Sequence, residues 1–177
     1  MNELILETDR LVLRRPRQDD FDAWVEMMRG ERSRFVGGPL TRPETWRMLA
    51  VVVGHWELRG FGLFAVVERS SGACIGRVGA WMPEAWPGKE VGWTLTNAAE
   101  GRGYAREAAV AALDWVFHGL GWTDVIHCIH PENARSIALA ERLGSRLLRT
   151  ADLPPPASHE VLIYGQSRKH WIAAQSA

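Results

Sequence analysis

Hydrophobic positions in this 177-residue chain alternate with polar ones in some segments and recur at helical spacing in others. Alternation or a short apolar run predicts a strand, whereas apolar positions three and four residues apart predict a helix. Strands are expected at residues 4–15, 63–68, 73–82, 90–96, 123–129, 146–149 and 161–166. Helices are expected at about 19–28, 41–60, 103–118 and 133–143.

The order of these elements is β-α-α-β-β-β-α-β-α-β-β. Runs of antiparallel strands interrupted by crossover helices predict an α/β fold, with a mixed sheet and helices on both faces. The chain shows no internal repeat and no low-complexity tract, and its length suits one core. We therefore expect a single domain over residues 1–177.

Local capping signals mark several helix ends. Thr41, with Glu44 three residues later, has the pattern of a capping box. Asn133 is expected to cap a later helix, and Gly144 suits the position just after that helix ends. One of the two successive aspartates at 19 and 20 is expected to cap the first helix.

Composition narrows the class of protein. Lys plus Arg and Asp plus Glu both number 21, and this balance argues against nucleic-acid binding, which favours a basic stripe. No apolar run approaches the roughly 18–20 residues of a membrane span, and the acidic start does not resemble a secretory signal. Two cysteines without a CxxC pattern favour a reduced, cytoplasmic setting. Most of the nine tryptophans are expected in the core.

A glycine-containing segment follows the strand at 90–96. Gly101-Arg102-Gly103 stands between this strand and a long helix, so backbone N–H groups at the helix start can bind an anion. Arg102 and Arg106 add positive charge. The GxxxxGK[ST] pattern is absent and GxGxxG is incomplete, which disfavours a P-loop and a dinucleotide site. A plain tight turn before a helix explains the local pattern equally well.

Residues 100–105 resemble the acetyl-CoA signature (Gln/Arg)-x-x-Gly-x-(Gly/Ala) of the GNAT (Gcn5-related N-acetyltransferase) superfamily. Glu100, Gly103 and Ala105 occupy its defined positions. Glu100 departs from the pattern, and we expect its carboxylate to point to solvent, away from a phosphate. Segments 6–14, 90–95, 133–136 and 141–144 resemble the RimJ/RimL-like branch, the ribosomal-protein N-terminal acetyltransferases, although Ser145 stands where that branch usually has Phe.

The resemblance implies a GNAT fold whose mostly antiparallel sheet splays open between the fourth and fifth strands. Acetyl-CoA would be the acetyl donor and a primary amine the acceptor, with no metal ion. The cofactor would contact the fourth strand, the glycine loop and the start of the last crossover helix. The expected cofactor-binding residues are Trp93, Thr94, Leu95, Gly101, Arg102, Gly103, Tyr104, Ala105, Arg106 and Asn133.

The resemblance also suggests catalytic groups. Many family members carry a Tyr seven residues after the helix-capping Asn, but this chain has Ala140 there. Ser136 is the available hydroxyl and is expected to protonate the leaving sulfur, unless it only caps or packs in the helix. Glu90 is the expected general base, with His130, Glu132 or a water chain as alternatives. The histidines at 118 and 127 are expected to pack in the interior, and no HExxH spacing indicates a metal site.

Three functions remain open at this point. The first is acetyl transfer to a protein N-terminal α-amine or to a small-molecule amine, by direct attack in a ternary complex. The second is a non-catalytic acetyl-CoA sensor on the same fold, and the third is an interaction module that binds no CoA. The sequence leaves the acceptor open and is compatible with a monomer or a homodimer.

Overall fold

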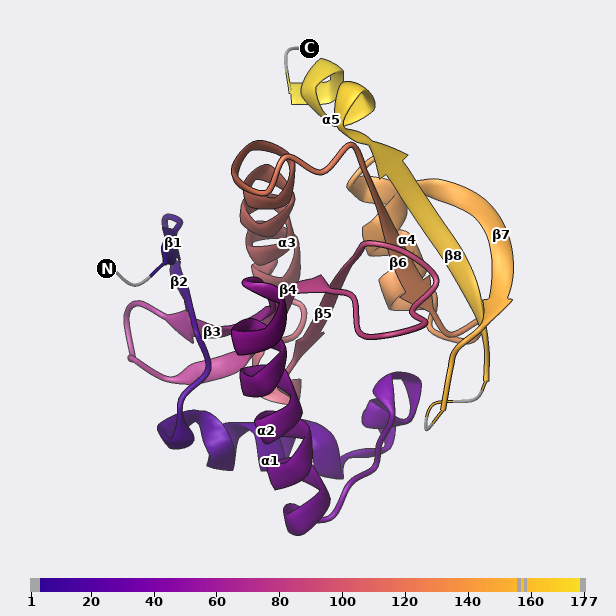
Figure 1. Cartoon of the computed structure of the whole chain (residues 1–177). Helices are drawn as coiled ribbons and strands as arrows, with labels where there is room; N and C mark the ends of the chain where they lie inside the picture. The colour runs from indigo at the N-terminus through magenta and orange to yellow at the C-terminus, as the bar shows by residue number, and fades with distance from the viewer. Residues whose placement is uncertain (1–3, 156, 158, 176–177) are drawn as a thin grey trace.

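The computed structural model describes residues 4–155, 157 and 159–175, which form one eight-stranded sheet in the order β1-β2-β3-β4-β5-β6-β8-β7 (Figure 1). Within these residues, every neighbouring pair of strands is antiparallel except β5 and β6, which are parallel. The strands are β1 (Ile5–Glu7), β2 (Leu11–Arg14), β3 (Leu63–Glu68), β4 (Cys74–Trp81), β5 (Glu90–Leu95), β6 (Asp124–Ile129), β7 (Arg146–Asp152) and β8 (Glu160–Ser167). The expected mixed, mostly antiparallel sheet is confirmed.

Helices pack on both faces of this sheet (Figure 1). They are α1 (Phe21–Arg29), α2 (Arg42–Arg59), α3 (Tyr104–Asp114), α4 (Ala134–Arg142) and α5 (Arg168–Gln175). Helices α1 and α2 pack on each other near β4, α3 packs against β4 and β5, and α4 packs against β6 and β8. None of the helices described in the structure has the length and apolar character needed to cross a membrane.

Three boundaries differ from the expectation. The segment at 4–15 is a hairpin of two strands, because a turn held by Thr8 N donating to Leu11 O (3.0 Å) reverses the chain. Helix α3 ends at Asp114 and continues as a wider π turn, Trp115–Gly119, in which Leu120 N bonds to Trp115 O (3.1 Å). Helix α5 was not expected, and its short 168–175 segment is anchored by one buried tryptophan, Trp171.

The capping predictions are confirmed for two helices and wrong for one. Thr41 N donates to Glu44 Oε2 (2.8 Å) at the start of α2. Asn133 Oδ1 accepts from the backbone N–H of Ser136, the third residue of α4 (3.2 Å). Asp20 makes no cap bond to α1. It accepts instead from Arg17 N (2.7 Å) and pairs with Arg14, so its carboxylate fixes the turn before the helix.

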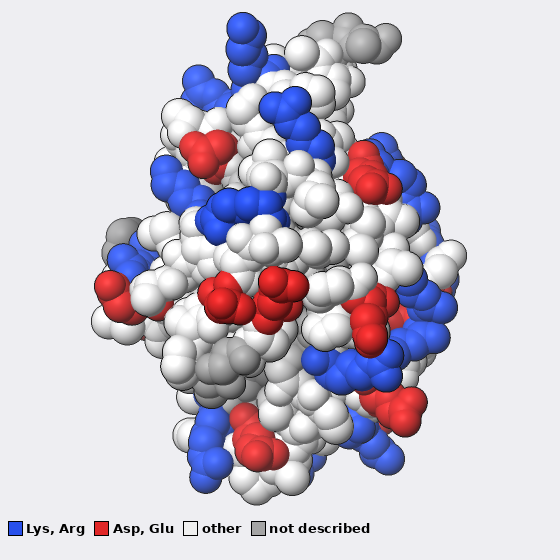
Figure 2. Space-filling view, turned by 90° about the vertical axis from the view of Figure 1, so that its right-hand side faces the viewer, with Lys and Arg blue, Asp and Glu red and all other residues white. Residues whose placement is uncertain are grey.

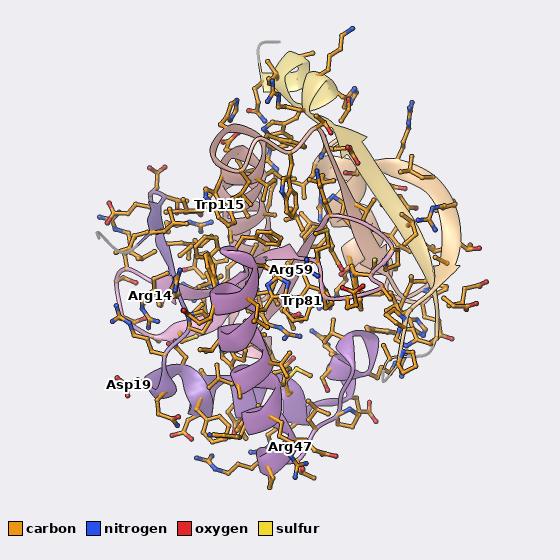
Figure 3. The ribbon with its side chains drawn as sticks, in the orientation of Figure 1. Arg14, Asp19, Arg47, Arg59, Trp81 and Trp115 are labelled. Atoms are coloured by element: carbon orange, nitrogen blue, oxygen red, sulfur yellow. The ribbon has the colours of Figure 1, made fainter. Side chains whose placement is uncertain are left out.

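The core is rich in tryptophan, as expected, with four buried indoles: Trp24, Trp56, Trp122 and Trp171. Trp56 also donates from Nε1 to the carbonyl of Leu63 (2.9 Å), which fastens α2 to the start of β3. Trp115 stacks on Trp56 with ring centroids 5.8 Å apart, in the upper half of the view in Figure 3. Trp46 is the exception, since it is 52% exposed on α2.

The sheet opens between β5 and β6, the strands expected fourth and fifth. Glu90 and Ile126 form their single paired position, next to a bond from Ile126 N to Lys89 O (2.9 Å). Beyond this point the strands diverge, and the opening leads into a groove of about 1180 Å³. The sheet topology therefore places the site at the position where backbone groups of two central strands lack a strand partner.

Candidate functional site

A groove of about 1180 Å³ runs along the opening between β5 and β6. It is lined by the 3₁₀ segment at 31–36, by β5, by the loop at 97–106 and by the start of α4. Ten of the sequence-predicted residues lie in its wall: Trp93, Thr94, Leu95, Gly101, Gly103, Tyr104, Ala105, Arg106, Asn133 and Ser136. Arg102 and Glu90 are not among the lining residues.

The glycine loop forms a backbone cradle at one end of the groove. Gly101 and Gly103 have φ of +73° and +81°, a region that residues with a Cβ rarely adopt. The first intrahelical bond of α3 runs from Glu107 N to Gly103 O (3.1 Å), so the N–H groups of the three preceding residues have no intrahelical acceptor. These donors and the positive end of the helix dipole suit a phosphate.

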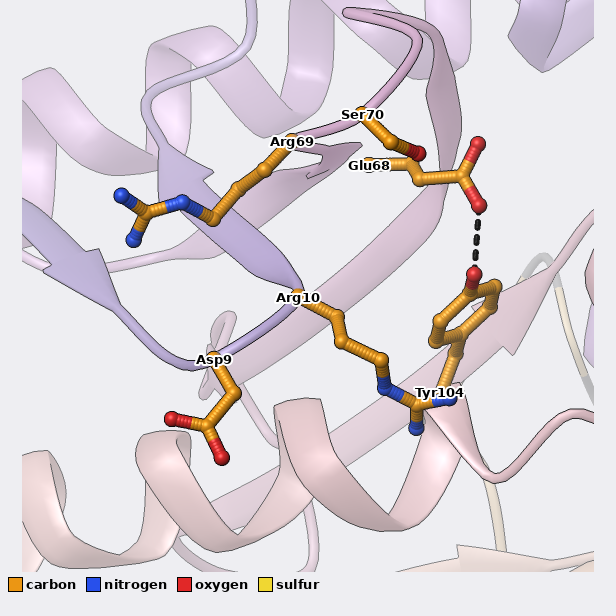
Figure 4. Close-up of a pocket in the computed structure, with 6 residues that line it drawn as sticks. All are labelled: Asp9, Arg10, Glu68, Arg69, Ser70 and Tyr104. Atoms are coloured by element: carbon orange, nitrogen blue, oxygen red, sulfur yellow. Dashed lines mark hydrogen bonds between the residues drawn. The ribbon is translucent and has the colours of Figure 1, made fainter.

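Arg102 contributes its backbone to this loop but turns its side chain away from the groove. Its guanidinium pairs with Glu68 of β3 (3.1 Å) and lies over the Tyr104 ring, 4.7 Å from the centroid. Figure 4 shows the hollow of about 430 Å³ on that side, where the Tyr104 hydroxyl donates to Glu68 and the Arg10 side chain lies against the ring. The expectation that Arg102 adds charge to the groove is wrong, because Glu68 competes for it.

Glu100 also differs from the expectation. Its side chain is 27% exposed and lines the groove, where Arg32 of the 31–36 segment and Arg135 of α4 both form ion pairs with it. Two guanidinium groups offset the repulsion that a carboxylate exerts on a phosphate. The departure from the signature at position 100 is therefore compensated by arginines from two other segments.

Ser136 is held by an indole. Trp93 Nε1 on β5 donates to Ser136 Oγ (3.2 Å), while Ser136 N donates to the capping Asn133. Because the hydroxyl oxygen accepts from Trp93, the hydroxyl keeps its own proton for donation to a different acceptor. The site of the family's Tyr, Ala140, is fully buried against Ile129.

Glu90 lies at the base of the opening and is 8% exposed. Its carboxylate accepts from Trp86 Nε1 (2.5 Å) and from the backbone N–H of Cys128 (3.2 Å), a β6 donor beyond the last strand pair. Burial raises the pKa of Glu90 to about 7, and the two hydrogen bonds only partly oppose this rise. A carboxyl with this pKa can exchange a proton near neutral pH.

His127 of β6 bonds in turn to the backbone of β5, a contact that sequence reasoning missed. Its Nδ1 bonds to Val91 O of β5 (2.7 Å) and its Nε2 to Ser145 Oγ (2.9 Å). Because a carbonyl only accepts, Nδ1 carries the proton and Nε2 accepts from the serine. Burial lowers the pKa of His127 to about 4, so the ring is neutral at pH 7. Ser145, which stands where the RimJ/RimL-like branch usually has Phe, was the sequence signal for this hydrogen bond.

The two remaining candidate bases are His130, which is not among the residues that line the groove, and Glu132. The His130 ring packs 5.2 Å from the Phe35 ring, and its Nδ1 accepts from Glu132 N (3.1 Å). Glu132 lines the groove and pairs loosely with Arg34 (3.6 Å). His118 is exposed, contrary to the expectation that it packs inside.

The surface of the protein carries charges of both signs. On the face in Figure 2, acidic and basic side chains are interspersed. Among residues 4–155, 157 and 159–175, no cluster of three or more His, Cys, Asp or Glu side chains is placed to hold a metal ion.

Comparisons with known proteins agree with this geometry. An acetyltransferase from Agrobacterium tumefaciens has 36% sequence identity and a TM-score of 0.84, over 95% of this chain and 96% of that one. A ribosomal-protein-S5-alanine acetyltransferase from Vibrio fischeri shares the fold, with a TM-score of 0.72 at 18% identity over 96% and 99% of the two chains.

Two curated relatives come from Bacillus. The N-acetyltransferase p20 of Bacillus licheniformis, whose own role is uncharacterized, is 27% identical over 78% of this chain and 80% of that protein. The uncharacterized protein YkkB of Bacillus subtilis is 30% identical, over 54% of this chain and 60% of that protein. The family profile described as "Acetyltransferase (GNAT) domain" matches residues 10–146. The chain therefore belongs to the GNAT family of N-acetyltransferases, in its RimJ/RimL-like branch.

Proposed function

We propose that the protein transfers an acetyl group from acetyl-CoA to a primary amine, on a protein N-terminus or a small molecule, by direct attack in a ternary complex. The observation that carries this proposal is the groove, which joins the backbone cradle at Gly101 and Gly103 to the opening between β5 and β6. Phosphates would bind at the cradle, and the thioester would lie near Ser136.

The proposed reaction forms a C–N bond and breaks a C–S bond. Acetyl-CoA supplies the thioester carbonyl carbon. The acceptor ammonium loses two protons in all, one before its nitrogen attacks and one as the product amide forms. One proton goes to the departing sulfur and the other to solvent, so CoA leaves as the thiol.

In this proposal Ser136 and Glu90 have different tasks. Ser136 donates its proton to the sulfur, since Trp93 already occupies its oxygen. Glu90 receives the acceptor's proton through water that crosses Gly92, a half-exposed residue of the central strand β5 that has no side chain to block the path. A pKa of about 7 lets Glu90 both take up and release this proton.

The first experiment is thermal unfolding with acetyl-CoA, CoA or NAD, followed by detection of thiol release with a panel of amines. A ligand at ~100 times its Kd stabilises the fold by about 2.7 kcal/mol, or roughly 5–10 °C for a chain of this length. We expect a rise with acetyl-CoA and CoA but none with NAD. The absence of any rise would refute the proposed site. A rise without thiol release from any amine would favour a non-catalytic sensor.

A further inference from the structure

The hollow of about 430 Å³ in Figure 4 adjoins the start of α3, next to the glycine loop. Six residues line it: Asp9, Arg10, Glu68, Arg69, Ser70 and Tyr104. Of these six, only Tyr104 also lines the groove. The start of α3 therefore borders the groove on one side and this hollow on another, and the acetyl-transfer steps above use none of the other five residues.

Arg10, in the turn between β1 and β2, connects this hollow to the glycine loop. Its Nη1 donates to the carbonyl oxygen of Arg102 (3.0 Å), and its Nε donates to Glu107 Oε2 in the first turn of α3 (2.7 Å). The backbone N–H of Arg10 (2.9 Å) and the hydroxyl of Thr8 (2.6 Å) both donate to Glu107 Oε1. One guanidinium thus joins the loop to the helix that follows it, and the carboxylate of Glu107 holds that guanidinium in place.

The ring of Tyr104 gives the same guanidinium a further contact. The Cζ atom of Arg10 lies 4.4 Å from the ring centroid, and the Arg102 guanidinium packs at 4.7 Å from it. The Tyr104 hydroxyl donates to Glu68, the last residue of β3, and Tyr104 is only 3% exposed. Side chains of the β1–β2 turn and of β3 therefore fasten the loop from the side of the hollow.

The bond from Arg10 to the Arg102 carbonyl also sets the direction of one backbone donor. This carbonyl and the N–H of Gly103 belong to one peptide group, which is planar and trans, so they point in opposite directions. Arg10 lines the hollow and not the groove, whereas Gly103 lines the groove. A carbonyl held toward Arg10 therefore directs the Gly103 N–H away from the hollow. In the described part of the chain, no backbone carbonyl accepts from this N–H.

The sequence of the loop does not fix this peptide group by itself. Glycines at 101 and 103 stand on both sides of Arg102, and residues without a Cβ adopt either sign of φ at little steric cost. A loop that must be ordered when a ligand arrives loses affinity to the cost of that ordering. Arg10 supplies the order before binding, and its Nη2 would lie only 3.4 Å from a Cβ placed on Gly103.

We propose that Arg10 is a positioning residue for the acetyl donor: through the Arg102 carbonyl and Glu107, it holds the glycine loop in the shape that binds the phosphates of acetyl-CoA. This inference rests on the proposed function. The alternative is that Arg10 serves stability alone, by joining the β1–β2 turn to α3. Its side chain is 47% exposed, and exposed ion pairs contribute little to stability, which favours the positioning role.

The test compares acetyl-CoA with S-acetylpantetheine, which has the same acetylated thiol arm but no phosphate. Thiol release is measured with the most reactive amine of the panel at a fixed high concentration. Arg10→Met should lower kcat/KM for acetyl-CoA by about 10- to 100-fold, mainly through KM, because a misplaced binding group loses much of its effect. It should leave kcat/KM for S-acetylpantetheine unchanged, since this thioester has no phosphate to place on the loop. A purely structural role would lower both values alike.

Glu107→Gln is the second variant, and it decides the matter if Arg10→Met does not fold. It keeps an oxygen that accepts from Thr8 but loses the charge that holds Arg10, so it should show the same selective loss to a smaller extent. Arg69→Met is the matched control. Arg69 lines the same hollow but bonds to the Thr8 carbonyl (3.0 Å) and pairs loosely with Glu7 (3.7 Å), so its replacement should leave both values unchanged.

Thermal unfolding gives a readout that does not depend on turnover. The rise in Tm with acetyl-CoA should be smaller for Arg10→Met than for the wild type and for Arg69→Met. Equal losses of kcat/KM for the two thioesters, or an unchanged value for acetyl-CoA in both variants, would overturn the inference while acetyl transfer stands. Absence of both acetyl-CoA stabilisation and thiol release in the wild type would instead overturn the proposed function.

Discussion

Replacement of His127 by Phe tests whether a buried hydrogen-bond network holds the sheet opening in place. Phe keeps an aromatic ring against Trp93, whose ring centroid lies 4.8 Å from that of His127. The change leaves the Val91 carbonyl without its donor and the Ser145 hydroxyl without its acceptor, both inside the protein. Each of these two buried groups costs about 1–3 kcal/mol when it loses its partner, so we expect a loss of about 2–6 kcal/mol.

This loss is a large share of a typical folding free energy of about 5–15 kcal/mol. For a chain of 177 residues it corresponds to a fall in Tm of roughly 4–24 °C. Urea unfolding and thermal unfolding at pH 7 both measure it. His118→Phe is the control, since His118 is exposed and its replacement should change stability by less than about 0.5 kcal/mol.

A double variant separates the network from simple packing. With His127 already replaced, Ser145→Ala removes a hydroxyl that has lost its partner, and should return about 1 kcal/mol of stability. His127→Phe and Ser145→Ala should therefore be non-additive. A loss below about 1 kcal/mol for the single His127 variant, or strictly additive effects, would refute the assignment of these two hydrogen bonds.

Three further predictions concern the groove. The rate of acetyl transfer should rise with pH to a plateau above about 7, and Glu90→Gln should remove this pH dependence. Because the pKa of Glu90 in the folded protein exceeds its usual 4.5, the wild type should also lose stability, on the order of 3 kcal/mol, as the pH rises from about 4.5 to 7. Urea unfolding of Glu90→Gln at both pH values should not show this loss. Gly103→Ala forces an alanine to φ of +81° and should cost about 1–2 kcal/mol and shrink the thermal response to acetyl-CoA, whereas an unchanged response would contradict the cradle. Ser136→Ala should lower kcat about 10²-fold with the acetyl-CoA response intact, and an unchanged kcat would assign Ser136 to helix capping alone.

Features set by neighbours in sequence could be predicted from the sequence. The Thr41–Glu44 box, the Asn133 cap and the glycine loop each depend on residues within a few positions of one another. The same holds for the alternation of apolar and polar positions that predicts the central strands. The order of elements then limited the fold to a mixed sheet with crossover helices.

The errors arise where distant segments meet. Arg102 turns away because Glu68, 34 residues earlier, takes its guanidinium, and Glu100 faces Arg32 and Arg135 from two other elements. The side chains of Glu90 and His127 bond to the opposite strand only where β5 and β6 part. No local pattern reports such contacts, which depend on the completed sheet.

The position of β8 also has a consequence during synthesis on the ribosome. Although β8 is the last of the described strands in sequence order, it lies between β6 and β7 and pairs with both. Until residue 167 emerges, β6 therefore exposes an open edge and β7 has no partner, so the unfinished chain is exposed to edge-to-edge association. The second half of the sheet is therefore completed only when β8 pairs, late in synthesis and well after the glycine loop at 97–106 has been made.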